Sequence, residues 1–93
     1  MIYAYAKLTV SNPEALSDYR DKAGPALARH GGKVVQGSGN VMPIDGAPDV
    51  PDVAAILSFP DKNSALQWIN DPDLADIHAL RRSSGGSEIL LLT

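Results

Sequence analysis

Hydrophobic and polar positions first alternate and then recur at helical spacing, and this order predicts the elements of the fold. In residues 2–10 every second side chain is apolar, which is the period of a β-strand with one buried face. The apolar set consists of Ile2, Ala4, Ala6, Leu8 and Val10, and the opposite set of Tyr3, Tyr5, Lys7 and Thr9. The second set joins aromatic bodies to polar tips, so we expect it to form a wet pocket or an interface.

A helix is predicted after this strand. Asn12 and Pro13 give a side-chain cap followed by a proline in the first turn, where the missing amide hydrogen is not needed. Apolar and aromatic side chains then recur on one helical face: Leu16, Tyr19, Ala23, Ala26, Leu27 and His30. Pro25 should kink or break this helix, and Gly31 with Gly32 should end it.

Two strands and a long connection occupy the middle of the chain. Residues 33–42 predict a strand in which Gly37 and Gly39 mark a bulge or an edge position. Residues 43–52 are rich in proline, glycine and aspartate, and they predict a turn-rich connection. Residues 53–59 are almost all apolar, which is typical of a central strand.

The last third of the chain predicts a broken helix. Asp61 is a suitable N-cap for a helix that runs through Asn70. Asp71-Pro72 should end it and start a second helical piece at residues 73–82. Residues 83–87 contain only serine and glycine, so they predict a flexible link.

A final aliphatic strand at residues 88–93 completes the order strand, helix, strand, strand, helix, strand. Right-handed crossovers turn this order into an α+β, ferredoxin-like βαββαβ sheet with the first and third strands in the centre. The helices cover one face of the sheet, so the side that carries Tyr3 and Tyr5 is left bare. We expect a second copy of the chain to cover it, giving a dimeric α+β barrel with a cavity between sheet and helices in each subunit.

Composition narrows the class of protein. The 93 residues are too few for two cores, so we predict a single domain over residues 1–93. A net charge of −3 opposes nucleic acid and anionic membranes as partners. The chain has no cysteine and therefore no disulfide or thiolate nucleophile. It shows no signal-peptide pattern and no apolar run that spans a bilayer, so we expect a cytoplasmic protein.

Short motifs occur in a fixed order along the whole chain. They are His30-Gly31-Gly32-Lys33, Ile44-Asp45-Gly46, Phe59-Pro60-Asp61, Ala65 with Trp68, Asp71-Pro72 and Leu80-Arg81. This ordered set resembles the domain of unknown function 1330 (DUF1330) family. The resemblance implies a dimeric α+β barrel and a homodimer, and no general reaction is established for the family. The chain departs from the family pattern at Asp52, Ser58 and Asp73-Leu74, which removes polar groups that other members carry.

A second pattern places Trp68, His78 and Arg82 along the broken helix. It resembles the haem-degrading monooxygenases of the same fold, in which a histidine ligates the iron and a tryptophan packs near the porphyrin. The resemblance implies haem as a cofactor and His78 as its ligand. Those enzymes also carry an asparagine on the first strand, where this chain has Ala6 and Lys7. We therefore expect no cofactor, with haem as the alternative.

Six residues are the candidates for lining a ligand pocket: Tyr3, Tyr5, Tyr19, Trp68, His78 and Arg81. Tyr5, Lys7 and His78 are the candidates for catalysis, because tyrosine or lysine can stabilise an enolate and histidine can move a proton near neutral pH. Each has a structural alternative. Tyr5 would pack in an interface, and Trp68 would belong to the core. His78 would be an ordinary side chain in the last turns of a helix, favoured there by the dipole, and Arg81 would sit at a solvated helix end.

Other functional motifs do not fit the sequence. Gly37-Ser38-Gly39 lies in a predicted strand and opens no helix, so it is not a phosphate-binding loop. Asp45, Asp49 and Asp52 lack the spacing of a calcium loop. The two histidines lie far apart in the sequence, so we expect no metal site.

Three functions remain open at this point. The first is an enzyme, a cofactor-independent oxygenase or isomerase that acts on an aromatic or polyketide-like molecule in the barrel cavity. The second is a ligand-binding or stress-related dimer with the same cavity and no turnover. The third is a haem-binding, monooxygenase-like protein that uses His78. The sequence identifies neither the ligand nor a reaction.

Overall fold

The strands and helices follow the predicted order in a computed structural model that describes residues 1–93. The elements are β1 (Ile2–Val10), α1 (Pro13–Ala28), β2 (Lys33–Ser38), β3 (Val53–Phe59), α2 (Lys62–Asn70), the 3₁₀-helix η1 (Pro72–Leu74), α3 (Ala75–Ser83) and β4 (Gly85–Leu92). The four strands form one antiparallel sheet in the order β2-β3-β1-β4. The predicted α+β, ferredoxin-like architecture with central first and third strands is therefore confirmed.

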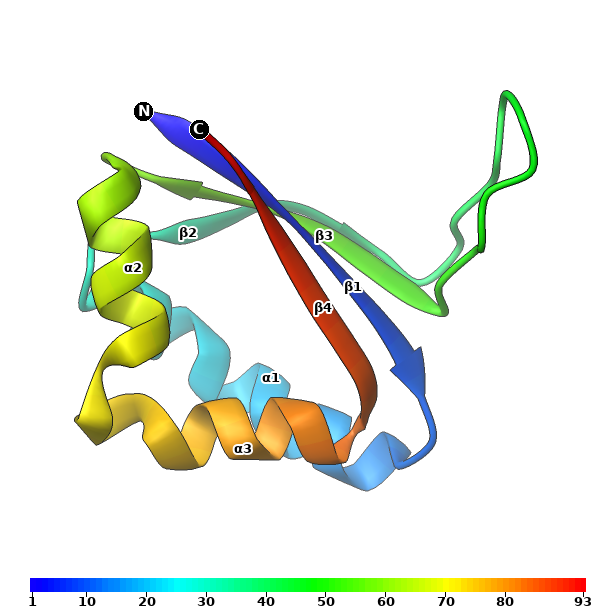
Figure 1. The fold of residues 1–93 in the computed structure, drawn as a ribbon. Coiled ribbons are helices and arrows are strands. Elements are labelled where there is room, and N and C mark those ends of the chain that lie inside the picture. Colours follow the sequence, from blue (N-terminus) through cyan, green and yellow to red (C-terminus); the bar gives the residue numbers. More distant parts are fainter.

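All helices lie toward one face of the sheet, and the other face is bare (Figure 1). We call the covered face the helix side and the bare face the open face. The register fixes which residues share a face, because Tyr5 of β1 is paired with Ile56 of β3 and with Leu90 of β4. The open face therefore carries Tyr3, Tyr5, Lys7, Ile56, Glu88, Leu90 and Leu92. None of the helices combines the length and the hydropathy needed to cross a membrane.

The core fills one half of the helix side. Leu27, Leu57, Phe59, Trp68 and Leu74 are buried there together with small alanines. The ring centroids of Phe59 and Trp68 are 5.5 Å apart. Burying each of these large side chains contributes about 1.5–3 kcal/mol, so the cluster holds α1 and α2 on the sheet.

A polar joint connects the end of α1 to η1. His30 Nε2 lies 2.8 Å and Arg29 Nε 3.2 Å from the same oxygen of Asp71. The Asp71 carboxylate also caps η1, because it accepts a hydrogen bond from the Asp73 amide at 2.9 Å. The bonds from His30 and Asp73 hold the pKa of Asp71 below its usual range. His30 thus has a structural role in this joint.

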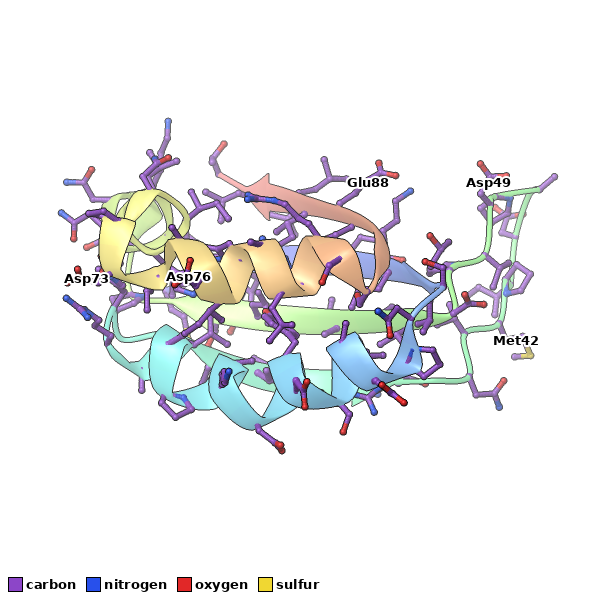
Figure 2. The ribbon with its side chains drawn as sticks, turned by 90° about the horizontal axis from the view of Figure 1, so that it is seen from below. Met42, Asp49, Asp73, Asp76 and Glu88 are labelled. Carbon is purple, nitrogen blue, oxygen red and sulfur yellow. The ribbon has the colours of Figure 1, made fainter.

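The β2–β3 connection, residues 39–52, forms an arm that projects beyond the sheet (Figure 1). In the view from the helix side, Met42 and Asp49 lie on this arm, away from α1 and α3 (Figure 2). The predicted strand over residues 33–42 is wrong in length, since β2 ends at Ser38 opposite Ala54. Its irregularity falls between Val34 and Gln36 and not at a glycine. The predicted edge position is confirmed, since β2 is an outer strand of the sheet.

Two further local predictions need correction. Of the kink or break predicted at Pro25, the break is wrong, because α1 continues to Ala28. The carbonyl of exposed Asp21, which proline leaves without an amide partner, can bond to water instead. The predicted serine-glycine link is also wrong, because α3 runs to Ser83, Ser84 caps it, and β4 begins at Gly85. Gly85 has φ +148, and a side chain there would collide with the Thr9 carbonyl oxygen, so the close pairing of β4 with β1 requires glycine.

Candidate ligand cavity

The half of the helix side that the core leaves free holds a half-open cavity of about 500 Å³. It lies between α1 and the sheet, and eleven of its seventeen lining residues are hydrophobic. The space exists because the positions facing it carry small residues: Ala6, Ala23, Gly24, Gly37 and Ala55. This volume and lining are typical of a site for a small organic ligand.

Arg81 supplies the polar end of the cavity from α3, and Tyr19 supplies it from α1. The Arg81 side chain is buried, with 3% of the residue exposed. Its Nε donates to Ser87 Oγ at 3.1 Å, and its Nη1 donates to His78 Nδ1 at 2.7 Å and to Tyr19 Oη at 3.5 Å. The guanidinium carbon lies 5.6 Å from the centre of the Tyr19 ring and 5.4 Å from that of Trp68.

His78 lies behind Arg81 and is held on both ring nitrogens. Because arginine can only donate, Nδ1 of His78 is an acceptor, and Nε2–H donates to the Trp68 carbonyl at 2.9 Å. Burial, and then the charges of Arg81 and Arg82, lower the pKa of His78 below its usual value of 6.5. His78 is therefore a neutral imidazole that positions Arg81 and Trp68.

The surroundings of His78 do not fit a haem ligand. The residue is 2% exposed, and ligation of iron through either nitrogen would break one of the two hydrogen bonds. Nor does any group of three or more His, Asp and Glu side chains in the chain have the geometry to hold a metal ion.

Trp68 packs between the core and the polar end of the cavity. Its ring meets His78 edge-on at a centroid distance of 4.7 Å, and 3% of the residue is exposed. Its Nε1 has no hydrogen-bond partner. Trp68 thus supports the residues of the cavity from behind, and its own side chain belongs to the core.

The sequence candidates fall on both sides of the sheet. Tyr19, Trp68, His78 and Arg81 form one connected cluster on the helix side. Tyr3, Tyr5 and Lys7 lie on the open face, so the sheet separates them from that cluster. The structure therefore does not bring Tyr5 and Lys7 together with His78. Lys7 Nζ lies 3.9 Å from a carboxylate oxygen of Glu88, and Tyr3 Oη donates to Met1 Sδ at 3.6 Å.

The expectation that Arg81 is a solvated helix end is wrong. Packing of α3 against α1 and β4 buries Arg81, whereas the neighbouring Arg82 is exposed. Sequence reasoning also missed Arg20 and Ser38, which line the cavity. The signal that could have located the cavity is the repeated use of alanine and glycine in the segments that face each other across it. Small side chains there leave space unfilled.

Solved structures with the same fold match nearly the whole chain. RPA0582, a protein of unknown function from Rhodopseudomonas palustris, is 23% identical with a TM-score of 0.72, and the match covers 98% of this chain and 79% of that one. SnoaB from Streptomyces nogalater, described as a cofactor-independent oxygenase, is 17% identical with a TM-score of 0.67. That match covers 99% of this chain and 90% of SnoaB. At these identities the similarity shows a shared fold.

No curated protein matches the chain. A family does match it: Domain of unknown function (DUF1330) covers residues 1–93. The resemblance read from the ordered motifs is thus confirmed, and the chain belongs to the DUF1330 family.

Proposed function

We propose that this protein binds a small, largely apolar organic molecule in the cavity between α1 and the sheet. The observation that carries the proposal is the 500 Å³ cavity, mostly hydrophobic in lining, with Tyr19 and Arg81 gathered at one end. An apolar wall with a few convergent polar groups is the usual design of a small-molecule site, because the wall provides affinity and the polar groups fix orientation.

Cofactor-independent oxygenation of an aromatic or polyketide-like molecule is the reaction that we propose to test first, with isomerisation beside it. SnoaB shares the fold and is described as such an oxygenase. Both reactions pass through a phenolate or enolate. The Tyr19 hydroxyl and the Arg81 guanidinium are donors that would stabilise the developing negative charge on oxygen.

A binding protein without turnover is the second candidate, and one observation favours it. The residues lining the cavity include no aspartate, glutamate or histidine, and His78 uses both ring nitrogens within the protein. A general base must be able to reach the proton that it removes. A cavity without one would hold a ligand and leave it unchanged.

We also propose that the protein acts as a homodimer joined through the open faces of two sheets. Leu90 is 62% and Leu92 65% exposed on that face, next to partly exposed Tyr3 and Ile56. Exposed apolar side chains grouped in this way favour association, and a two-fold axis would place the same residues of both copies against each other.

Ligand screening with a blocked cavity tests the proposed function. Phenols, quinones and lactones are added to the protein, and binding is measured by calorimetry. Ala23→Phe places a ring in the cavity, and Ala28→Phe places the same ring on the exposed side of α1. We expect ligands that bind the wild type and Ala28→Phe to lose affinity for Ala23→Phe. Equal affinities for the two variants would contradict the proposal.

Chromatography of the same mixtures after incubation in air separates the two candidates. A ligand that is consumed supports the enzyme. If ligands bind and are recovered unchanged, the binding protein is favoured.

A further inference from the structure

We infer that the ligand of the cavity is an organic anion whose acidic oxygen, a carboxylate or a phenolate, is bound by Arg81 and Tyr19. The inference rests on the proposed function, since it specifies the chemical class of the molecule bound in that cavity. It adds a charge requirement that neither the fold nor the family supplies.

Arg81 is a buried cation without a counter-ion. Only 3% of the residue is exposed, yet it takes part in none of the ion pairs of the chain. Its partners are neutral: the hydroxyls of Ser87 and Tyr19 and the unprotonated Nδ1 of His78. Neutral acceptors and aromatic faces give the guanidinium hydrogen bonds and contacts, but they do not cancel its charge. A buried charge without a counter-ion is energetically costly. An anion in the adjacent cavity would remove that cost.

The charged residues that line the cavity also favour an anion. Its lining contains two arginines, Arg20 and Arg81, and no acidic residue. The chain as a whole has 11 acidic and 8 basic residues. Carboxylates are therefore abundant in the protein but absent from this site, which leaves the potential inside it positive and selects for a negative ligand.

Hydrogen-bond donors remain free at this end of the cavity. Nε and Nη1 of Arg81 have partners within the protein, whereas Nη2 has none. Tyr19 Oη accepts its bond from Arg81, so its own proton is available to donate. An acidic oxygen that accepts from Arg81 Nη2 and Tyr19 Oη would form charge-assisted hydrogen bonds, which are the strong ones.

A matched pair of probes tests the charge requirement directly. 2-Naphthoate and 2-naphthamide have the same size and aromatic body, and only the first is an anion at neutral pH. Both are titrated into the wild-type protein by calorimetry. We expect 2-naphthoate to bind about tenfold to hundredfold tighter, the range that charged hydrogen bonds provide. Equal affinity of the two probes overturns the inference and leaves the proposed function standing. Binding of neither probe contradicts both.

Three variants test which residues cause the preference for 2-naphthoate over 2-naphthamide. Arg81→Met keeps the length and apolar body of the side chain, and it should bring the affinity for 2-naphthoate down to that for 2-naphthamide. Arg82→Met removes a neighbouring but exposed arginine, so both affinities should stay unchanged. Tyr19→Phe removes one donor only and should weaken 2-naphthoate severalfold, which gives a readout even if Arg81→Met does not fold. A preference for the anion that survives in both Arg81→Met and Tyr19→Phe would place the anion elsewhere.

Discussion

Gly32 illustrates, at the scale of one residue, how closely the core is packed. A Cβ atom added there would lie 2.8 Å from Phe59 Cε1 and 3.2 Å from Leu27 Cδ2. We expect Gly32→Ala to lower the free energy of unfolding by about 1–3 kcal/mol, the usual cost of an overpacked core. Urea denaturation measures this directly.

Gly24→Ala is the matched control for Gly32→Ala. Gly24 lies inside α1, and a Cβ atom there would meet nothing within 4 Å apart from its chain neighbours and the helix backbone. Alanine is a better helix former than glycine by about 1 kcal/mol, but the ring of Pro25 disfavours a Cβ atom on the helical residue before it. The two effects oppose each other, so this variant should lose less stability than Gly32→Ala. If the two variants lose equal stability, the packing described around Phe59 is wrong.

His78 should make stability depend on pH. Its pKa is lowered in the folded protein, so the unfolded chain binds more protons below the usual value of 6.5. The contribution of His78 is complete above that value and is lost as the pH falls through the lower folded pKa. We expect the free energy of unfolding to decrease as the pH falls from about 7.5 to about 5.

His78→Gln isolates this contribution, because glutamine does not titrate. The variant should show a shallower decrease over the same range, and the difference between the two curves belongs to His78. Parallel curves for the wild type and His78→Gln would show that the imidazole titrates alike in the folded and the unfolded chain.

At the scale of elements, the N-cap of α1 provides a local test. The Asn12 side chain accepts a hydrogen bond from the Ala15 amide at 3.2 Å. We expect Asn12→Ala to cost about 1 kcal/mol of stability, because this amide then loses its partner. Asn12→Ser keeps a side-chain acceptor and should recover most of the loss. Equal stabilities of the two variants in urea would mean that the cap contributes nothing.

Hydrophobic periods sufficed to predict the order of the elements and the two faces of β1. They failed where pairing between segments far apart in the sequence decides whether a residue belongs to a strand. Gly85 and Gly86 read as a flexible link, yet they pair with Val10 and Thr9 in the sheet. Residues 39–42 read as strand, yet β3 offers no partner beyond the pairing of Ser38 with Ala54. Such pairing partners cannot be predicted from the local sequence.

The candidate site was predicted less fully than the fold, and Arg81 explains why. Adjacent arginines at the end of a helix look alike in sequence, and only the packing of α3 against α1 buries one and exposes the other. The face of Tyr5 was predicted from alternation. That the sheet separates Tyr5 from His78 is known only once the structure shows on which side of the sheet each residue lies.

At the scale of the whole molecule, the proposed dimer depends on the open face. Leu90 lies on that face opposite Tyr5. We expect Leu90→Glu to convert the dimer into a monomer, because two carboxylates would be buried without partners across the two-fold axis. Analytical ultracentrifugation measures the mass.

Leu66→Glu is the control for Leu90→Glu, since Leu66 is an exposed leucine on α2 and away from the open face. It should remain a dimer. A wild-type protein that sediments as a 9.8 kDa monomer would contradict the proposed assembly.

Amide chemical shifts show whether the ligand binds between α1 and the sheet. In a nuclear magnetic resonance titration with 2-naphthoate, we predict shifts at the amides of Tyr19, Gly24 and Ala55, which line the cavity. The amides of Tyr5 and Leu90 lie in β1 and β4 and their side chains on the open face, so their shifts should be smaller. Shifts largest at Tyr5 and Leu90, or no shifts at all, would contradict a ligand site between α1 and the sheet.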